Sequence, residues 1–157
     1  MGKVEALDKE FLFQGRVIIS ETDTKGNITY ANRKFCEISG YDRDELIGKP
    51  HSIIRHPDMP KEAFEKLWST IQSGQIWHGL VKNLRKDGKF YWVETEVLPS
   101  KNDKGEITGY TAARKAASRK DIEETSAMYK KMKEKDVTNL YDFVWKYASD
   151  GDIPSCG

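Results

Sequence analysis

The chain has only two cysteines among its 157 residues, Cys36 and Cys156. They are far apart in the sequence and lack the spacing of metal ligands, so we expect neither a disulfide framework nor a cysteine metal site. Cys36 falls in an apolar-periodic segment and is expected to be a small buried side chain. Cys156 is the penultimate residue, where we expect a mobile side chain.

Long hydrophobic runs are absent as well. No stretch approaches the roughly 18 consecutive apolar residues that a membrane-spanning helix needs. Residues 1–10 are charged and do not resemble a signal peptide. We therefore expect a cytoplasmic protein with no direct membrane insertion.

Neither sign of charge dominates the composition. Lys and Arg total 26 against 25 Asp and Glu, which gives a net charge of +1. Nucleic acids and anionic membrane surfaces select basic proteins, so the composition gives no reason to expect either as a partner. The length suggests one packed core with an extension.

Apolar patterning predicts strands at both ends of a domain and helices between them. Short strands at residues 17–19 and 28–30 flank a turn. Helical spacing predicts helices at residues 31–38 and 61–73, with short helical turns at residues 42–46 and 50–54 between them. The order is therefore two strands followed by three or four helices.

Three antiparallel strands are predicted after the helices, at residues 76–81, 90–98 and 107–112. The Asp87-Gly88 pair between the first two is a strong hairpin signal, because a tight turn of this kind needs positive φ. From Ala116 the chain becomes rich in charged residues and methionine. Apolar stripes there predict two amphipathic helices, at residues 119–134 and 136–147.

The run Arg55-His56-Pro57-Asp58-Met59-Pro60 packs three polar side chains into four residues between apolar helices. Proline fixes φ and restricts the residue before it, so the backbone here is stiff. One interpretation is a binding site. The other is a capped loop, in which Asp58 caps the next helix and Arg55 pairs with a surface carboxylate.

Several landmarks resemble the PAS family: Asp23-x-x-Gly26-x-Ile28-x-Tyr30-Ala31-Asn32-x-x-Phe35, Gly40-Tyr41-x-x-x-Glu45-Leu46-Ile47-Gly48, Asn83-Leu84-Arg85-Lys86-Asp87-Gly88-x-x-Tyr91-Trp92-Val93 and Gly109-Tyr110. The resemblance runs from about Val17 to Arg114. It implies an α+β PAS fold, a five-stranded antiparallel sheet with short helices on one face, plus C-terminal amphipathic helices. The expected domains are an N-terminal cap (1–15), a PAS sensor domain (16–115), a helical extension (116–148) and a flexible tail (149–157).

The Arg55 to Pro60 run, followed by Trp77-x-Gly79-x-Val81-Lys82-Asn83, resembles the flavin-binding PAS domains of bacterial aerotaxis and energy-taxis receptors. Those domains hold a non-covalent FAD as a redox reporter. The resemblance implies a non-enzymatic redox or oxygen sensor for signal transduction, acting on a membrane chemotaxis receptor or another signalling protein. A homodimer is also expected. The chain stops soon after the PAS core, which fits an excised domain or a stand-alone PAS protein.

The predicted cofactor-binding residues combine aromatic, amide and charged groups: Asn32, Arg55, His56, Asp58, Trp68, Trp77 and Asn83. Trp77 would lie beside the ring or fill the core, and the helical spacing of Trp68 fits a core residue as well as a site residue. Asn83 would read the ring edge or form a cross-strand hydrogen bond. Arg55 and His56 suit a pyrophosphate or a charge on the reduced ring, since arginine donates in bidentate fashion. Asp58 would orient them.

The role of Asn32 rests on the resemblance alone, because a residue at that position is most often a helix cap. Trp92 falls in the general strand pattern and is expected to be structural. His51 and His78 are expected to be exposed polar residues.

Three alternatives stay open. A heme sensor would need an axial histidine, and His56 is the only candidate ligand, in a polar and poorly suited wall. A cofactor-free PAS domain would dimerise or bind a partner through the segments 119–134 and 136–147. FMN could replace FAD. A photoreceptor of the cysteinyl-adduct kind is disfavoured by the position of Cys36, and no catalytic triad, carboxylate pair or metal-ligand set indicates an enzyme.

A redox mechanism would start from hydrogen bonds at the flavin. Reduction changes charge and protonation on the ring, and the bonds from Asn83 or its neighbours would rearrange. A shift in the sheet would then reach residues 1–16 or the helix after Ala116.

Overall fold

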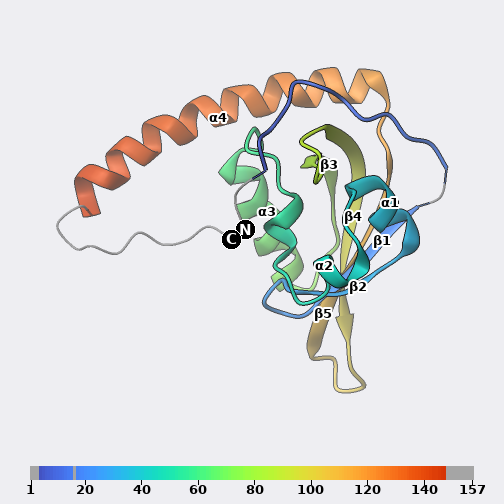
Figure 1. Ribbon diagram of the computed structural model, residues 1–157. Helices are drawn as coiled ribbons and strands as arrows, with labels where there is room; N and C mark the ends of the chain where they lie inside the picture. The colour runs from blue at the N-terminus through green and yellow to red at the C-terminus, as the bar shows by residue number, and fades with distance from the viewer. Residues whose placement is uncertain (1–3, 16, 148–157) are drawn as a thin grey trace.

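The computed structural model describes residues 4–15 and 17–147, with side chains described up to residue 135. Five antiparallel strands form one sheet in the order β2-β1-β5-β4-β3 (Figure 1). The strands are β1 (Ile18–Thr22), β2 (Ile28–Ala31), β3 (Trp77–Leu84), β4 (Phe90–Lys101) and β5 (Ile107–Ala116). The first and last parts of the domain therefore meet at the centre of the sheet, where β1 pairs with β5.

The helices between β2 and β3 cover one face of the sheet. They are α1 (Arg33–Ser39), α2 (Arg43–Leu46), η1 (His51–Ile54) and α3 (Lys61–Gln72). Asn32 caps α1 by accepting a hydrogen bond from the Phe35 amide at 3.0 Å, as its residue type favours. Gly40 ends the same helix with a φ of 79°, a conformation that glycine adopts at little cost. The predicted order of strands and helices is confirmed.

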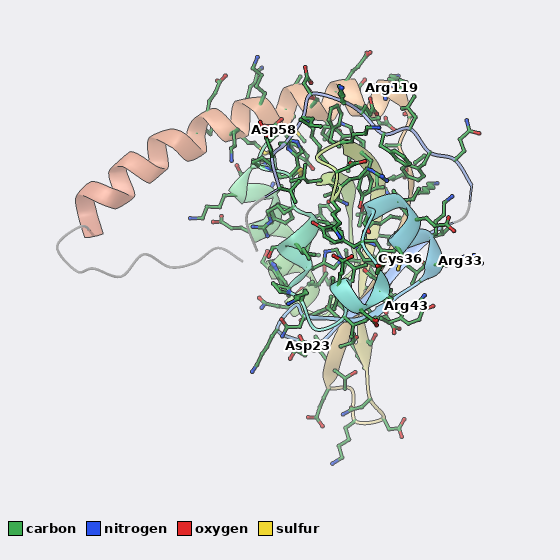
Figure 2. The ribbon with its side chains drawn as sticks, viewed as in Figure 1. Asp23, Arg33, Cys36, Arg43, Asp58 and Arg119 are labelled. Atoms are coloured by element: carbon green, nitrogen blue, oxygen red, sulfur yellow. The ribbon has the colours of Figure 1, made fainter. Side chains whose placement is uncertain are left out.

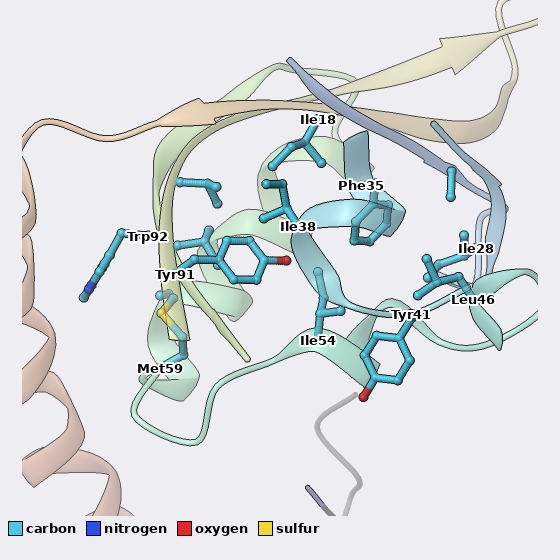
Figure 3. Packing of buried hydrophobic residues seen from close by; sticks show 14 of the residues in the cluster. Ile18, Ile28, Phe35, Ile38, Tyr41, Leu46, Ile54, Met59, Tyr91 and Trp92 are labelled. Atoms are coloured by element: carbon cyan, nitrogen blue, oxygen red, sulfur yellow. The ribbon is translucent and has the colours of Figure 1, made fainter. Parts of the chain in front are cut away.

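The core lies between the sheet and these helices. Phe35, Leu46, Ile54 and Tyr91 are all buried there to 1% exposure or less. Neighbouring residues of a strand face opposite sides of a sheet, and β4 shows this clearly: Tyr91 points into the core while Trp92 points to the other face (Figure 3).

The face that carries Trp92 is covered by α4 (Arg119–Tyr147). Tyr129 stacks on Trp92 with ring centroids 6.2 Å apart and donates its hydroxyl to the Leu80 carbonyl at 2.6 Å. The prediction of two separate helices was wrong, because α4 is continuous. No glycine or proline interrupts the sequence between the two predicted segments, so nothing stops the helix there.

In Figure 1, α4 begins after β5, crosses the sheet and extends beyond it. None of the helices in the described ranges is both long and apolar enough to cross a membrane. The predicted tail at residues 149–157 and the side chain of Cys156 lie outside the described residues.

The segment of residues 4–15 runs along the start of β4. The Phe11 amide donates to the Phe90 carbonyl at 2.7 Å, and the Phe90 amide donates to the Lys9 carbonyl at 2.9 Å. Arg119, the first residue of α4, forms an ion pair with Glu10 at 2.6 Å. The N-terminal segment and the start of α4 are therefore joined to each other as well as to the sheet.

Candidate functional site

A cavity of about 520 Å³ lies between the sheet and the helices η1 and α3. Its volume falls in the range of about 300–1,000 Å³ that small-molecule sites occupy. Apolar walls come mainly from α3 and from the inward positions of β3 and β4, and the side chains are Ile54, Phe64, Leu67, Trp68, Ile71, Val81 and Val97. At the β1–β2 turn and the end of α3, the exposed residues Thr24, Lys25 and Gln72 also line it.

A polar cluster of Ser20, His51 and Arg114 forms part of the cavity lining. Arg114 donates from Nη2 to Ser20 Oγ at 2.8 Å and to His51 Nε2 at 2.7 Å. Since a guanidinium only donates, His51 Nε2 must accept, which places the ring proton on Nδ1. Burial, helped by the charge of Arg114, lowers the pKa of His51 to about 3. His51 is therefore neutral at pH 7.

Burial also lowers the pKa of Arg114, to about 10. The guanidinium thus keeps its positive charge at neutral pH, although the residue is only 4% exposed.

Two polar groups in the cavity, Thr95 Oγ1 and Arg114 Nη1, lack hydrogen-bond partners among the described residues. The buried side chains of Asn83 and Tyr91 interact with each other and have no other hydrogen-bond partner there. Asn83, Thr95 and Arg114 line the cavity, and Tyr91 pairs with Asn83 across β3 and β4. Burial raises the pKa of Tyr91 to about 12, so its hydroxyl stays protonated. Buried polar groups are nearly always paired, so these atoms indicate a ligand that offers acceptors.

Three predicted site residues line this cavity: Arg55, Trp68 and Asn83. The Arg55 guanidinium stacks over the Phe64 ring at 3.7 Å from its centroid, and the backbones of Arg55 and Asn83 form an isolated bridge. Trp68 packs edge to face against Tyr110, with centroids 5.7 Å apart. Segments far apart in the sequence thus bring these three residues together.

The other four predicted residues, Asn32, His56, Asp58 and Trp77, lie outside the lining. Asn32 uses its amide within the fold, accepting from the Ile19 and Phe35 amides at 3.1 and 3.0 Å and donating to the Val17 carbonyl at 3.0 Å. His56 is 4% exposed and accepts from the Asp58 amide at 3.0 Å.

Asp58 pairs with Lys82 at 2.9 Å, and this hydrogen bond is the main cause of its lowered pKa. Figure 2 shows Asp58 on the side of the domain where α4 passes. Asp58 does not cap α3, since the N-cap position belongs to Pro60. The interpretation of the loop as an Asp58-capped connector was therefore wrong in that detail.

Trp77 is the first residue of β3, as predicted, and is half-buried. Its indole lies over Gly79: a Cβ at that glycine would fall 2.7 Å from the ring. By strand alternation Trp77 shares the face of Val81 and Asn83, although the cavity lining does not include it. Trp92 is buried between the sheet and α4, as expected of a structural residue.

The sequence did not identify Ser20, His51 or Arg114 as site residues. The prediction that His51 is exposed was wrong: its ring stacks on Phe35 at 5.8 Å and its Nε2 is hydrogen-bonded. His78 is exposed, as predicted, and lies 3.1 Å from Glu94. Strand alternation could have indicated two of them, because residues two positions apart in a strand face the same side of the sheet. Ser20 lies two positions after buried Ile18, and Arg114 lies two positions after buried Ala112.

A family profile described as PAS fold matches residues 28–114. The chain belongs to the PAS family. The PAS domain is 43% identical over 113 residues to the aerotaxis receptor of Escherichia coli, covering 72% of this chain and 22% of the receptor. It is 34% identical to the nitrogen fixation regulatory protein of Klebsiella pneumoniae, covering 67% of this chain and 21% of that protein. The predicted likeness to aerotaxis-type PAS domains is confirmed.

Among solved structures, the dark state of the blue-light photoreceptor Aureochrome1 LOV aligns with a TM-score of 0.63 at 24% identity, covering 71% of this chain and 86% of that one. This likeness supports the fold. The chain spans about a fifth of the length of the two curated relatives, so the comparisons bear on the PAS domain and its place in signalling proteins.

The residues that a heme sensor or a cysteinyl-adduct photoreceptor would use lie outside the cavity lining. His56, the candidate heme ligand, is absent from the cavity lining and packs edge to face on Phe90 at 6.1 Å. Cys36 is partly buried on α1, outside that lining, and burial raises the pKa of its thiol. In the described ranges, no group of three or more His, Cys, Asp or Glu residues could hold a metal ion.

Proposed function

We propose that this PAS domain is a redox- or oxygen-sensing module that binds non-covalent FAD in the cavity. Its flavin redox state would be relayed to a chemotaxis receptor or another signalling protein. One observation carries the proposal. A buried hydroxyl and a buried donor at the cavity, Thr95 Oγ1 and Arg114 Nη1, have no partner among the described residues, and each such group costs about 1–3 kcal/mol if it stays unpaired.

The chemistry of the cavity fits an isoalloxazine ring. Such a ring has an apolar dimethylbenzene side and a pyrimidine side with carbonyl oxygens and ring nitrogens that accept hydrogen bonds. The cavity divides in the same way, with apolar walls from α3 and the polar groups of Asn83, Thr95 and Arg114 on the strands. In this arrangement Trp68 would flank the ring, and Arg55 and Lys25 would meet the phosphates.

The bound flavin would supply reversible electron transfer, which no side chain provides. The residues of this chain would hold and orient it. Asn83 and Thr95 would fix its polar edge, while Ile54, Phe64 and Leu67 would keep water from one side.

The route out of the cavity in this proposal begins at Asn83 and Tyr91, which face each other across β3 and β4. Tyr91 packs edge to face on Phe13 with centroids 6.2 Å apart. The segment that carries Phe13 is joined to α4 through Glu10 and Arg119. A change in hydrogen bonding at Asn83 can bias the N-terminal segment and α4 only if they have two arrangements of similar free energy.

The names of the relatives agree with a signalling role, since one is an aerotaxis receptor and another a nitrogen fixation regulatory protein. A membrane receptor, a soluble regulator or a second copy of the chain would each be a reasonable partner. FAD is proposed ahead of FMN on the likeness to the aerotaxis receptor.

The test is the visible spectrum of the purified protein, followed by mass analysis of any released cofactor. We expect flavin bands and FAD in the supernatant. Asn83→Ala should lower FAD occupancy at least tenfold by leaving the ring edge without its amide partner, whereas His78→Ala, at an exposed position outside the cavity, should not change it.

A colourless protein that takes up no added FAD would refute the proposal and favour a cofactor-free partner-binding domain. A Soret band would favour heme. The relay is tested separately by hydrogen exchange of the oxidised and reduced protein. An identical exchange pattern outside the cavity would refute it.

A further inference from the structure

Arg114 is a buried cation in the cavity wall. It lies on β5, where it pairs in register with Ile18 of β1, and is 4% exposed. Its Nη2 is held by Ser20 Oγ and His51 Nε2 at 2.8 and 2.7 Å, and its guanidinium lies 5.1 Å from the centroid of the Phe35 ring. Nη1 has no hydrogen-bond partner among the described residues.

Neither group that holds Arg114 is charged. Ser20 is neutral, and the donation from Nη2 to His51 Nε2 requires an unprotonated nitrogen there. The low pKa of His51, about 3, agrees with a neutral ring. The positive charge of Arg114 is therefore fixed in place by neutral partners.

No carboxylate among the described side chains forms an ion pair with Arg114 or lines the cavity beside it. The described residues that line the cavity include no aspartate or glutamate, and they include two further cations, Lys25 and Arg55. No ion pair found among the described side chains involves Arg114. Buried charges are normally paired, because leaving one unpaired is costly. A ligand with a negative charge would therefore pair with the guanidinium of Arg114.

We propose that Arg114, positioned by Ser20 and His51, is the anion-recognition residue of the cavity and that it contacts a negatively charged edge of the ligand. The inference rests on the proposed function. With flavin as the ligand, the charged edge arises on reduction: the ring takes two electrons from a solution donor and one proton from water, and keeps one negative charge. Arg114 would then bind reduced FAD more tightly than oxidised FAD and hold it as the anion.

The other two lining cations are less suited to this role. Lys25 is exposed, where solvent and salt screen its charge. Arg55 is stacked on Phe64 and belongs to the loop after η1. Arg114 lies on a central strand of the sheet, next to the unpartnered Thr95 on β4, with which it pairs in register.

The test compares FAD dissociation constants for the oxidised protein and for protein reduced anaerobically with dithionite, in wild type, Arg114→Met, Arg114→Lys and Lys25→Met. In Arg114→Met the preference for reduced over oxidised FAD should fall at least tenfold, equivalent to about 30 mV for a two-electron couple. Arg114→Lys should keep most of the preference. Lys25→Met should weaken both forms equally, because the phosphates carry the same charge in each.

An unchanged preference in folded Arg114→Met would overturn the inference while leaving flavin binding in place. Failure of the wild type to bind either form would overturn the proposed function and this inference with it. If Arg114→Met does not fold, the wild type alone decides. Its bound reduced flavin should remain anionic at a pH where free reduced flavin is protonated, and a bound flavin that protonates like the free one would refute the role of Arg114.

Discussion

The stability of the domain should depend on pH through His51, and the structure gives both the sign and the size. Burial and the charge of Arg114 lower the pKa of His51 from 6.5 to about 3 in the folded protein. Between these values the unfolded chain binds a proton that the folded protein does not. The free energy of unfolding therefore decreases as the pH is lowered from about 6.5.

The size of this decrease depends on how far the pH lies below the pKa of His51 in the unfolded chain. About pH 5 is roughly 1.5 units below that pKa, and each unit corresponds to about 1.4 kcal/mol of unfolding free energy. The full loss would be about 2 kcal/mol. Because His51 is only partly shielded from solvent, we expect about 1–2 kcal/mol between about pH 7 and about pH 5.

The assay is urea unfolding at several pH values in this window, followed by tryptophan fluorescence, for wild type and His51→Gln. A glutamine carbonyl can accept from Arg114 but does not titrate. His56, whose pKa is lowered mainly by burial, is present in both proteins and cancels in the comparison.

The carboxylates with lowered pKa values, such as Asp58 and Asp87, lose their contribution only at more acidic pH. Wild type should lose about 1–2 kcal/mol more than His51→Gln on acidification. Equal losses in the two proteins would refute the neutral state of His51 in the folded protein.

Three further changes test the fold around the site. Tyr129→Phe removes the hydrogen bond to the Leu80 carbonyl and should lower the free energy of unfolding by about 1 kcal/mol in urea denaturation. The control Met128→Ala, at a 48% exposed position, should change it by less than about 0.5 kcal/mol. Equal effects of the two substitutions would contradict the docking of α4 through Tyr129. Gly79→Ala places a Cβ against the Trp77 indole, so tryptophan fluorescence should shift and FAD affinity should fall severalfold, and an unchanged spectrum would show that the indole does not lie over Gly79. Asn32→Ala removes the α1 cap and two hydrogen bonds to the β1 region, and it should lower the free energy of unfolding by about 2–3 kcal/mol. The FAD dissociation constant of the folded variant should not change. A loss of FAD affinity with unchanged stability would instead make Asn32 a ligand contact.

Local signals in the sequence were sufficient for most of the fold. Asp87 and Gly88 predict a hairpin because the turn needs a positive φ, and Gly88 has a φ of 92°. Asn32 and Gly40 bound α1 as a cap and a stop should. The continuity of α4 was missed because an interrupted apolar stripe does not interrupt backbone hydrogen bonds.

The cavity was only partly predictable, and the reason is the separation of its residues along the chain. Asn83, Arg55 and Trp68 stood in or near recognisable motifs. Arg114 and Ser20 are 94 residues apart and meet only because β1 pairs with β5. The lowered pKa of His51 comes first from burial and then from the charge of Arg114, and the residues next to His51 in the sequence predict neither.

The alternation of β4 decides how the two faces of the sheet are connected. Tyr91 faces the cavity side next to Asn83, while Trp92, its neighbour in sequence, stacks on Tyr129 of α4 (Figure 3). Adjacent residues of a strand share a planar peptide group, so a shift of the backbone at Tyr91 also moves the backbone at Trp92 unless φ and ψ between them change. A backbone displacement at Tyr91 is therefore passed to Trp92 or absorbed by bending of β4. The first place to look for a response to ligand chemistry is thus the contact of Trp92 with Tyr129, ahead of any loop around the cavity.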